Sequence, residues 1–393
     1  MEEWEKEYPK TDYLSQAKEP IEPVSPPGKP KYTVGVVLPL SGLHQPYGER
    51  VLQGIQLAAK ELDPSGKDPA VSLVLKDSKG DPAEAERAVE ALVSKENAIV
   101  ILGPLLGIEL DGAAKKAQEL KVPMITFSQK ELQSGINEFI FQNSLLPSDQ
   151  IQALVSFALK TSGLNIFGVF YPNSPYGRYF RNLFAQEVSR QGGKVFGTMA
   201  YQEGQTDFSH EIKIFFKIEA AKDQDSPRKR WGDEFQSGIT LDGLFIPDTH
   251  DRVGLILSQI AYYDIQGLTF LGTNAWNGPD LIPVAGKSAE GAIFTEAFFK
   301  KNPSSHRFVE TFQNAYKRDP KTLEAIGYDG ARLLVEILRS KPISSPVQLN
   351  EEISKIQNFQ GVSGLKGFRE GGKPLRTVSI LKVNKGQIEM VGP

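Results

Sequence analysis

Short apolar runs alternate with amphipathic stretches along most of this chain, and few folds accommodate that alternation. In the first third of the sequence the apolar runs lie at 33–38, 71–75, 98–102 and 122–127, and amphipathic stretches at 49–62, 83–96 and 109–120 separate them. Strands that alternate with helices in this way are typical of βαβ units, whose parallel strands form a sheet flanked by helices. We therefore predict an α/β fold built on parallel sheets.

One of these stretches carries a clear helix start. Asp81 is a residue type favoured at the N-cap, Pro82 suits the first helical position, and Glu84 lies three residues after the cap, as in a capping box. The pattern predicts that a helix begins directly after Asp81.

The same alternation starts again after residue 150. Helices are predicted at 154–162, 176–191, 209–217 and 251–264, and strands at 165–171, 194–201, 241–247 and 268–272. A sequence echo accompanies the repeat, because Gly-Val, Pro and Ser followed by Tyr-Gly occur in the same order at 35–48 and at 168–177. We infer two similar lobes, each with a tyrosine (Tyr47 and Tyr176) in a loop after a strand. Strand-end loops are where open α/β sheets bind ligands.

The bulk composition excludes several classes of function. A chain of 393 residues suits two α/β domains of roughly 150 residues each, plus tails. A net charge of −3 gives no reason to expect nucleic acid as a partner. The chain has no cysteine, which excludes disulfides, thiolate metal sites and cysteine nucleophiles. Its four histidines lie far apart, so we expect neither a metal site nor a cofactor.

Sequence motifs of catalysis are also missing. The chain contains no nucleophile elbow, phosphate-binding loop, dinucleotide fingerprint or zinc-protease motif. A pair of catalytic carboxylates that meets only in the fold is left open by the sequence. On balance we expect a binding protein and not an enzyme.

Two segments depart from the alternating pattern. Residues 1–31 are charged and rich in proline, which predicts a linker or tail. Residues 219–238 form a charged, irregular insertion, which we interpret as a surface loop, with a partner-docking arm as the alternative.

Candidate binding residues of the first lobe follow two of its strands. The turn Leu105, Leu106 and Gly107 precedes a helix, so its N–H groups could hold a carboxylate, although a plain tight turn is equally compatible with the pattern. Ser128 and Gln129 end the next strand and offer hydroxyl and amide donors, unless Ser128 is only an N-cap. Tyr47 and Tyr176 would supply apolar walls with a polar tip, or be ordinary half-buried aromatics.

The second lobe offers a similar set. Asp248 and His250 follow one strand and Asn274 follows the next, where they could accept hydrogen bonds from a ligand ammonium group. The alternatives are that Asp248 caps the following helix and that His250 is a structural residue and not a catalytic one.

At these loops the sequence resembles the type I periplasmic binding proteins, specifically the leucine/isoleucine/valine-binding branch. The resemblance is carried by an ordered set of segments at 33–42, 47–54, 74–82, 101–104, 122–125, 176–177, 207–208, 327–331, 361–364 and 368–372. It implies two lobes joined by three crossings, with lobe one at 31–147 plus 275–342 and lobe two at 148–274 plus 343–393. A solute such as an amino acid would bind between the lobes for an ABC-type transporter permease. The implied location is the periplasm, with a lipid anchor in the full-length protein as an option.

Three positions depart from the pattern of the amino-acid binders. Gly107 replaces a serine that usually grips the ligand carboxylate, Lys130 replaces a common threonine, and Asn274 lies where an acid pairs with the ammonium. Another acid of lobe two must then supply that charge, and we expect Asp248 to face the cleft opposite Ser128. Asp248→Asn would in that case cost several kcal/mol of affinity, because it leaves a buried cation unpaired.

A second resemblance gives the alternative function. The insertion at 219–238 and the segments at 244–248 and 271–277 are similar to the penicillin-binding-protein activator group. That similarity implies a regulatory lipoprotein domain that contacts a peptidoglycan synthase, without a transported ligand.

Overall fold

The computed structural model describes residues 31–62, 71–132, 138–218 and 241–392. The predicted tail at 1–31, except Lys31, and the insertion at 219–238 lie outside these residues. No helix in the described ranges combines the length and the apolar character needed to cross a membrane.

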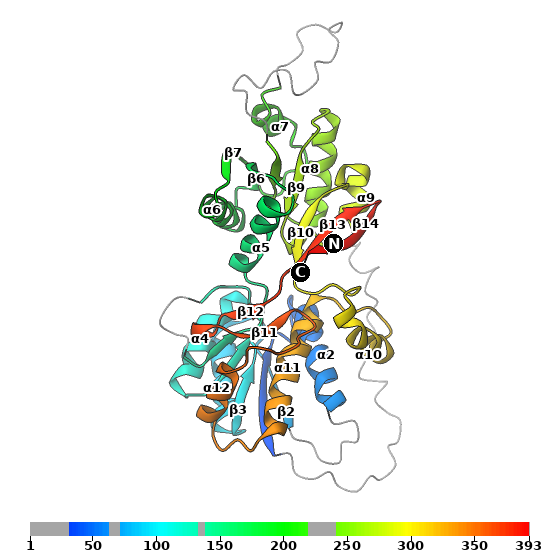
Figure 1. The fold of residues 1–393 in the computed structure, drawn as a ribbon. Helices are drawn as coiled ribbons and strands as arrows, with labels where there is room; N and C mark the ends of the chain where they lie inside the picture. The colour runs from blue at the N-terminus through cyan, green and yellow to red at the C-terminus, as the bar shows by residue number, and fades with distance from the viewer. Residues whose placement is uncertain (1–30, 63–70, 133–137, 219–240, 393) are drawn as a thin grey trace, which may run out of the picture.

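Two lobes, each built around its own parallel sheet, make up the molecule (Figure 1). The first contains β1 (Tyr32–Leu38), α2 (Gln45–Leu62), β2 (Val71–Asp77), α3 (Pro82–Ser94), β3 (Ala98–Leu102), α4 (Gly107–Glu119), β4 (Met124–Thr126) and β5 (Ile140–Gln142). Its strand order is β2-β1-β3-β4-β5, and all pairs are parallel. The helix predicted after Asp81 is confirmed, because the Asp81 carboxylate accepts hydrogen bonds from the N–H groups of Ala83 and Glu84, both at 2.9 Å.

The second lobe repeats this topology. It contains α5 (Pro147–Lys160), β6 (Ile166–Pro172), α6 (Pro175–Arg190), β7 (Lys194–Tyr201), α7 (Ser209–Phe215), β8 (Gly243–Phe245), α8 (His250–Tyr262), β9 (Thr269–Gly272), α9 (Leu281–Ala285), β10 (Ile293–Glu296), β13 (Ser379–Asn384) and β14 (Gln387–Gly392). Its parallel part has the order β7-β6-β8-β9-β10, the same as in lobe one when counted along the chain, and the antiparallel strands β13 and β14 extend it. Two similar α/β lobes are therefore confirmed.

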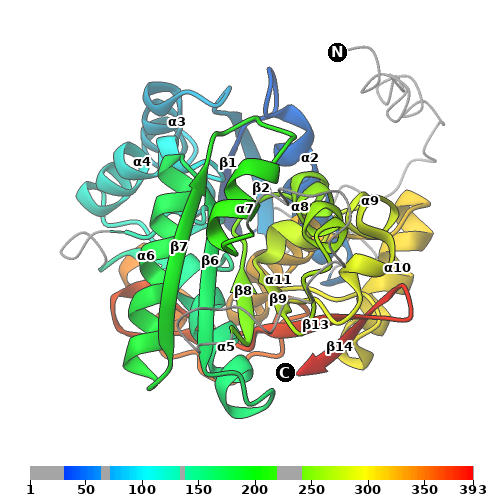
Figure 2. The same ribbon diagram turned by 90° about the horizontal axis from the view of Figure 1, so that it is seen from above.

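Helices cover both faces of each sheet. In β1, Val36 and Leu38 pack toward α2 and α11 (Thr322–Ser340), whereas Val37 points to the other face with α3 and α4. Figure 2 shows α7, α8 and α9 on one side of the second sheet and α5 and α6 on the other. Each sheet is thus buried on both faces, as parallel sheets are.

The chain crosses between the lobes three times, as predicted, but two of the crossings lie elsewhere than expected. Residues 275–296 were assigned to lobe one, yet β10 pairs with β9 and β13 in the sheet of lobe two. The stretch from 343 to 376 was assigned to lobe two. Its elements α12 (Pro346–Ser354), β11 (Leu365–Phe368) and β12 (Pro374–Arg376) belong instead to lobe one, together with α10 (His306–Tyr316), because Leu349, Leu365 and Phe368 are buried in its core.

Candidate ligand-binding site

The carboxyl ends of the strands in each lobe face the other lobe. Strand β5 ends at Gln142, and the chain enters lobe two at Pro147; β10 ends at Glu296, and the chain then returns to lobe one. Because parallel strands end at one edge of their sheet, both carboxyl edges lie at the junction of the lobes. Ligands of open α/β sheets bind at this edge, where the strand order reverses. The reversal lies between β1 and β3 in lobe one and between β6 and β8 in lobe two.

The Tyr-Gly pairs that recur in the two lobes lie at these two equivalent positions. Both positions require glycine for the same steric reason. A Cβ at Gly48 would lie 2.1 Å from the carbonyl oxygen of Pro39, and one at Gly177 would lie 2.0 Å from that of Pro172. The first turn of α2 and of α6 therefore packs directly on the end of the preceding strand.

Apolar side chains are left exposed at this edge of both lobes. Tyr47 and Ile108 of lobe one are 46% and 62% exposed, and Tyr176 of lobe two is 42% exposed. The Tyr176 hydroxyl shares a hydrogen bond with the Thr273 hydroxyl (3.3 Å), and burial of this hydroxyl raises the pKa of Tyr176 to about 12. Tyr176 thus offers its ring while its polar tip is occupied, which suits contact with an apolar ligand group.

The predicted carboxylate site at the start of α4 is partly occupied by the protein itself. The N–H of Leu106 donates to Glu109 Oε2 (3.2 Å), and burial raises the pKa of Glu109. The N–H of Gly107 has no acceptor among the residues described. Leu105 is partly buried against the core of lobe one.

Ser128 is fully buried, and its polar atoms form hydrogen bonds with residues of the protein. Its hydroxyl accepts from the Lys130 N–H (3.1 Å), and its carbonyl accepts from the Ser144 hydroxyl (2.5 Å). No helix begins in residues 129–132, directly after Ser128, so the N-cap alternative is wrong. Gln129 is exposed.

The residues at positions 107 and 130, which both depart from the pattern of the amino-acid binders, are in contact with each other. A Cβ at Gly107 would lie 3.2 Å from Lys130 Cβ and 3.6 Å from Lys130 Cδ, so the lysine stem lies where a larger residue would project. The Lys130 ammonium binds Asp111 Oδ2 (2.6 Å) on the exposed side of α4. A cation therefore lies beside the start of this helix, where negative charge is favoured.

The Asp248 carboxylate already has hydrogen-bond and ionic partners within lobe two. It accepts from the Tyr201 hydroxyl (2.6 Å) and the Thr249 N–H (2.8 Å), and Arg252 Nε lies 3.2 Å away. Burial nevertheless raises the pKa of Asp248. The sequence analysis missed Tyr201 and Arg252; the only signal was that Tyr201 ends a strand and Arg252 lies one helical turn after Asp248.

The remaining two candidates are held by local contacts. His250 Nδ1 lies 3.2 Å from Asp280 Oδ2, and the imidazole packs against Gly278. The backbone N–H of Asn274 donates to Gln150 Oε1 (3.0 Å). The Tyr176 hydroxyl contacts Thr273, and the Asp248 charge acts with burial to raise the pKa of Tyr176.

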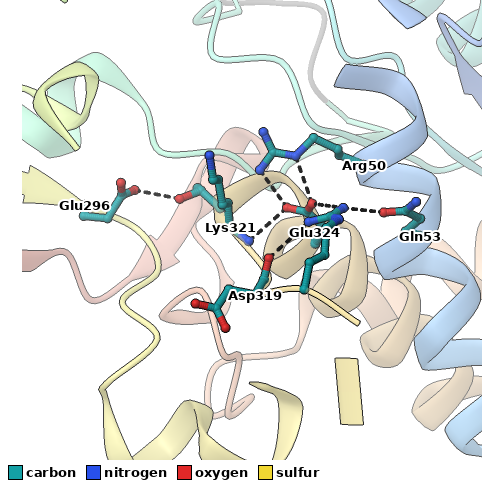
Figure 3. Close-up of polar contacts among 8 residues, drawn as sticks. Arg50, Gln53, Glu296, Asp319, Lys321 and Glu324 are labelled. Atoms are coloured by element: carbon teal, nitrogen blue, oxygen red, sulfur yellow. Dashed lines mark hydrogen bonds and ion pairs between the residues drawn. The ribbon is translucent and has the colours of Figure 1, made fainter. Parts of the chain in front are cut away.

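A polar cluster at the start of α11 ties the lobes together (Figure 3). Glu324 is fully buried and accepts two hydrogen bonds from Arg50 of α2, both at 2.9 Å, and one from Arg318 at 2.6 Å. Thr322, in the same turn, donates to Glu296 at the end of β10 (3.0 Å). This last contact joins lobe one to lobe two beside a crossing.

Comparison with known proteins agrees with this architecture. The family model described as periplasmic binding protein matches residues 31–387. A Leu/Ile/Val-binding protein homolog 2 of Brucella abortus is 21% identical over 353 residues, 87% of each chain. A leucine-binding protein from Thermotoga maritima is 26% identical with a TM-score of 0.67, over 92% of this chain and 98% of that chain. A branched-chain amino acid transporter substrate-binding protein of Streptococcus pneumoniae, solved with isoleucine, is 21% identical with a TM-score of 0.66, over 92% of this chain and all of that chain.

These relatives and structures are named as binding proteins, and none as an enzyme. They confirm the resemblance to the leucine/isoleucine/valine-binding branch, and an extracytoplasmic location follows from the family. The chain belongs to the periplasmic binding protein family.

Proposed function

We propose that the protein is the solute receptor of an ABC-type transporter and binds a small carboxylate with an apolar body between its lobes, aliphatic amino acids being the first candidates. The observation that carries the proposal is the exposure of Tyr47, Ile108 and Tyr176 at the facing edges of the two sheets. Burying these side chains against an apolar ligand would favour binding by about 25 cal/mol per Å².

The polar groups at the same edges favour a ligand carboxylate. The N–H of Gly107 lies at the start of α4 and would meet a negative charge in lobe one, beside the Lys130 ammonium, which is shared with Asp111. In lobe two Asp248 is our candidate for pairing with a ligand ammonium. Its carboxylate would bind the ammonium in addition to Arg252 and Tyr201, which it already contacts. A charged ligand group shut off from water must be paired in this way.

Calorimetric titration with three matched ligands tests the proposal. Leucine carries both charges, 4-methylpentanoate lacks the ammonium, and leucinamide lacks the carboxylate. We expect leucine and 4-methylpentanoate to bind and leucinamide not to bind. A ligand that binds should also stabilise the fold, by about 2.7 kcal/mol at a concentration 100 times its Kd. Equal binding of leucinamide would contradict the assignment of the carboxylate site. No response to any amino acid or organic acid would instead support the peptidoglycan-synthase regulator.

A further inference from the structure

A basic groove runs along the hinge, outside the proposed ligand site. It consists of two adjoining hollows of about 590 and 420 Å³ that share Gln152, Ser156 and Lys160 of α5. None of the ten candidate ligand-binding residues lines either hollow. We call this feature the hinge groove.

Both lobes form the walls of the hinge groove. Helix α5 and the start of β13 belong to lobe two, whereas the hairpin β11–β12 belongs to lobe one. In Figure 1, α5 lies directly above β12 at the junction of the lobes. An occupant of the groove would therefore contact both lobes at once.

Positive charge dominates the lining. Five cations line the two hollows: Lys160, Arg190, Lys366, Arg369 and Arg376. Two of them are neutralised, because Arg369 binds Asp149 (2.6 Å) and Arg190 binds Glu187. Lys160 and Lys366 are exposed, and neither forms an ion pair with a described residue. Arg376 is held within the protein, because its guanidinium donates to Asn143 Oδ1 (2.9 Å). Burial lowers the pKa of Arg376 to about 10, and the charges of Asp149 and Asp329 partly offset this effect.

Apolar side chains lie between these cations. Phe157 of α5, Leu375 of β12 and Val378 at the crossing line the larger hollow. The cations extend through both hollows, from the end of α6 to the hairpin. An extended chain with alternating acidic and apolar residues matches this distribution.

We propose that the hinge groove docks an extended acidic segment of a partner protein. Carboxylates of the segment pair with Lys160 and Lys366, and its apolar side chains pack on Phe157 and Leu375. This inference concerns a surface distinct from the cleft, so it holds or fails independently of which solute the cleft binds.

Fluorescence anisotropy with a labelled peptide of four Glu-Leu repeats tests the docking. The groove variant carries Lys160→Glu and Lys366→Glu, one substitution in each lobe. Its matched control carries Lys287→Glu and Lys95→Glu, also one in each lobe, at exposed lysines without a carboxylate partner among the described residues. We expect the groove variant to bind the peptide at least tenfold more weakly than the wild type and the control variant to bind as the wild type does. Melting temperatures should be equal, because all four side chains are exposed.

Three results would overturn the proposal. Equal weakening in the control variant would show attraction to net charge alone, and unchanged binding in the groove variant would place the peptide elsewhere. Citrate that binds with the same dependence on Lys160 and Lys366, while the peptide does not bind, would make the groove a small-anion site. A Lys-Leu peptide of equal length serves as the negative probe.

Discussion

At the scale of single residues, Gly48 and Gly177 show why the two lobes share a sequence echo. Each has a backbone carbonyl within 2.1 Å of the place where a Cβ would lie. We expect Gly48→Ala and Gly177→Ala each to lower the free energy of unfolding by about 1–3 kcal/mol, because the helix must move away from the strand end. Urea denaturation followed by circular dichroism measures the loss.

Gly112 in α4 is the control for these substitutions. A Cβ there would have its nearest neighbour, Glu86 Oε2, at 3.5 Å, which is ordinary contact. Alanine in a helix interior is favoured over glycine by about 0.5–1 kcal/mol, so Gly112→Ala should leave stability unchanged or raise it. A Gly48→Ala protein as stable as the wild type would show that α2 does not approach β1 so closely.

Substituting the exposed tyrosines of the cleft should change the affinity for leucine without changing the stability of the fold. Tyr47→Ala and Tyr176→Ala should each weaken leucine binding by about 5- to 150-fold, because each removes an apolar wall worth about 1–3 kcal/mol. Tyr262 is 78% exposed at the far end of α8, and Tyr262→Ala should leave the Kd unchanged. Calorimetry gives the Kd values, and a loss of binding in Tyr262→Ala would place the ligand outside the cleft.

The sequence pattern predicted which residues lie at the carboxyl edges of the sheets, but not the hydrogen bonds made there. Tyr47 and Tyr176 could be placed after equivalent strands because strand, loop and helix repeat in the same order in both lobes. The pairing of Asp248 with Tyr201 could not be found, because the two residues are 47 positions apart and meet only when β7 and β8 join one sheet. The contact of Lys130 with Gly107 was hidden for the same reason.

At the scale of elements, α2, α3, α4, α6 and α8 were predicted, whereas the long helix α11 and the short strands β5 and β10 were not. Strand β5 has three residues and β10 has four, so neither forms an apolar run that stands out from its neighbours. Pairing with adjacent strands defines them, and pairing is not visible in the sequence. The misassigned crossing after residue 274 follows directly, since β10 keeps the chain in lobe two for about 20 more residues.

The start of α11 gives a prediction about pH. Burial acts to raise the pKa of Glu324, but the guanidinium groups of Arg50 and Arg318 outweigh it and hold the pKa below its usual value. Such a carboxylate stabilises the fold above its unfolded pKa of about 4.3, and the stabilisation is lost as the pH falls through the lower folded value. Glu324→Gln should therefore cost about 1–3 kcal/mol at pH 7 and progressively less below pH 4.

Urea denaturation at pH 7 and near pH 3 measures this difference. Glu310 on α10 is exposed, so Glu310→Gln is the control and should differ little from the wild type at either pH. A stability loss for Glu324→Gln that is the same at both pH values would show that the network acts through packing and not through charge.

At the scale of the whole molecule, three crossings between two similar lobes allow one lobe to rotate on the other. The polar link between Thr322 and Glu296 lies beside one crossing, and the hinge groove lies beside the other two. A solute that contacts both lobes favours the closed arrangement by its difference in affinity for the two states.

Closure should therefore depend on the ligand and on its contacts with both lobes. We expect saturating leucine to lower the radius of gyration measured by small-angle X-ray scattering, because Tyr47 and Ile108 of lobe one and Tyr176 of lobe two become buried together. With Tyr176→Ala the same fall should require more leucine, since the ligand loses an apolar contact with lobe two while its contacts with lobe one remain. Tyr262→Ala should compact at the wild-type concentration. A bound protein whose radius of gyration does not change would show that the solute occupies one lobe alone, and closure would then not be part of its recognition.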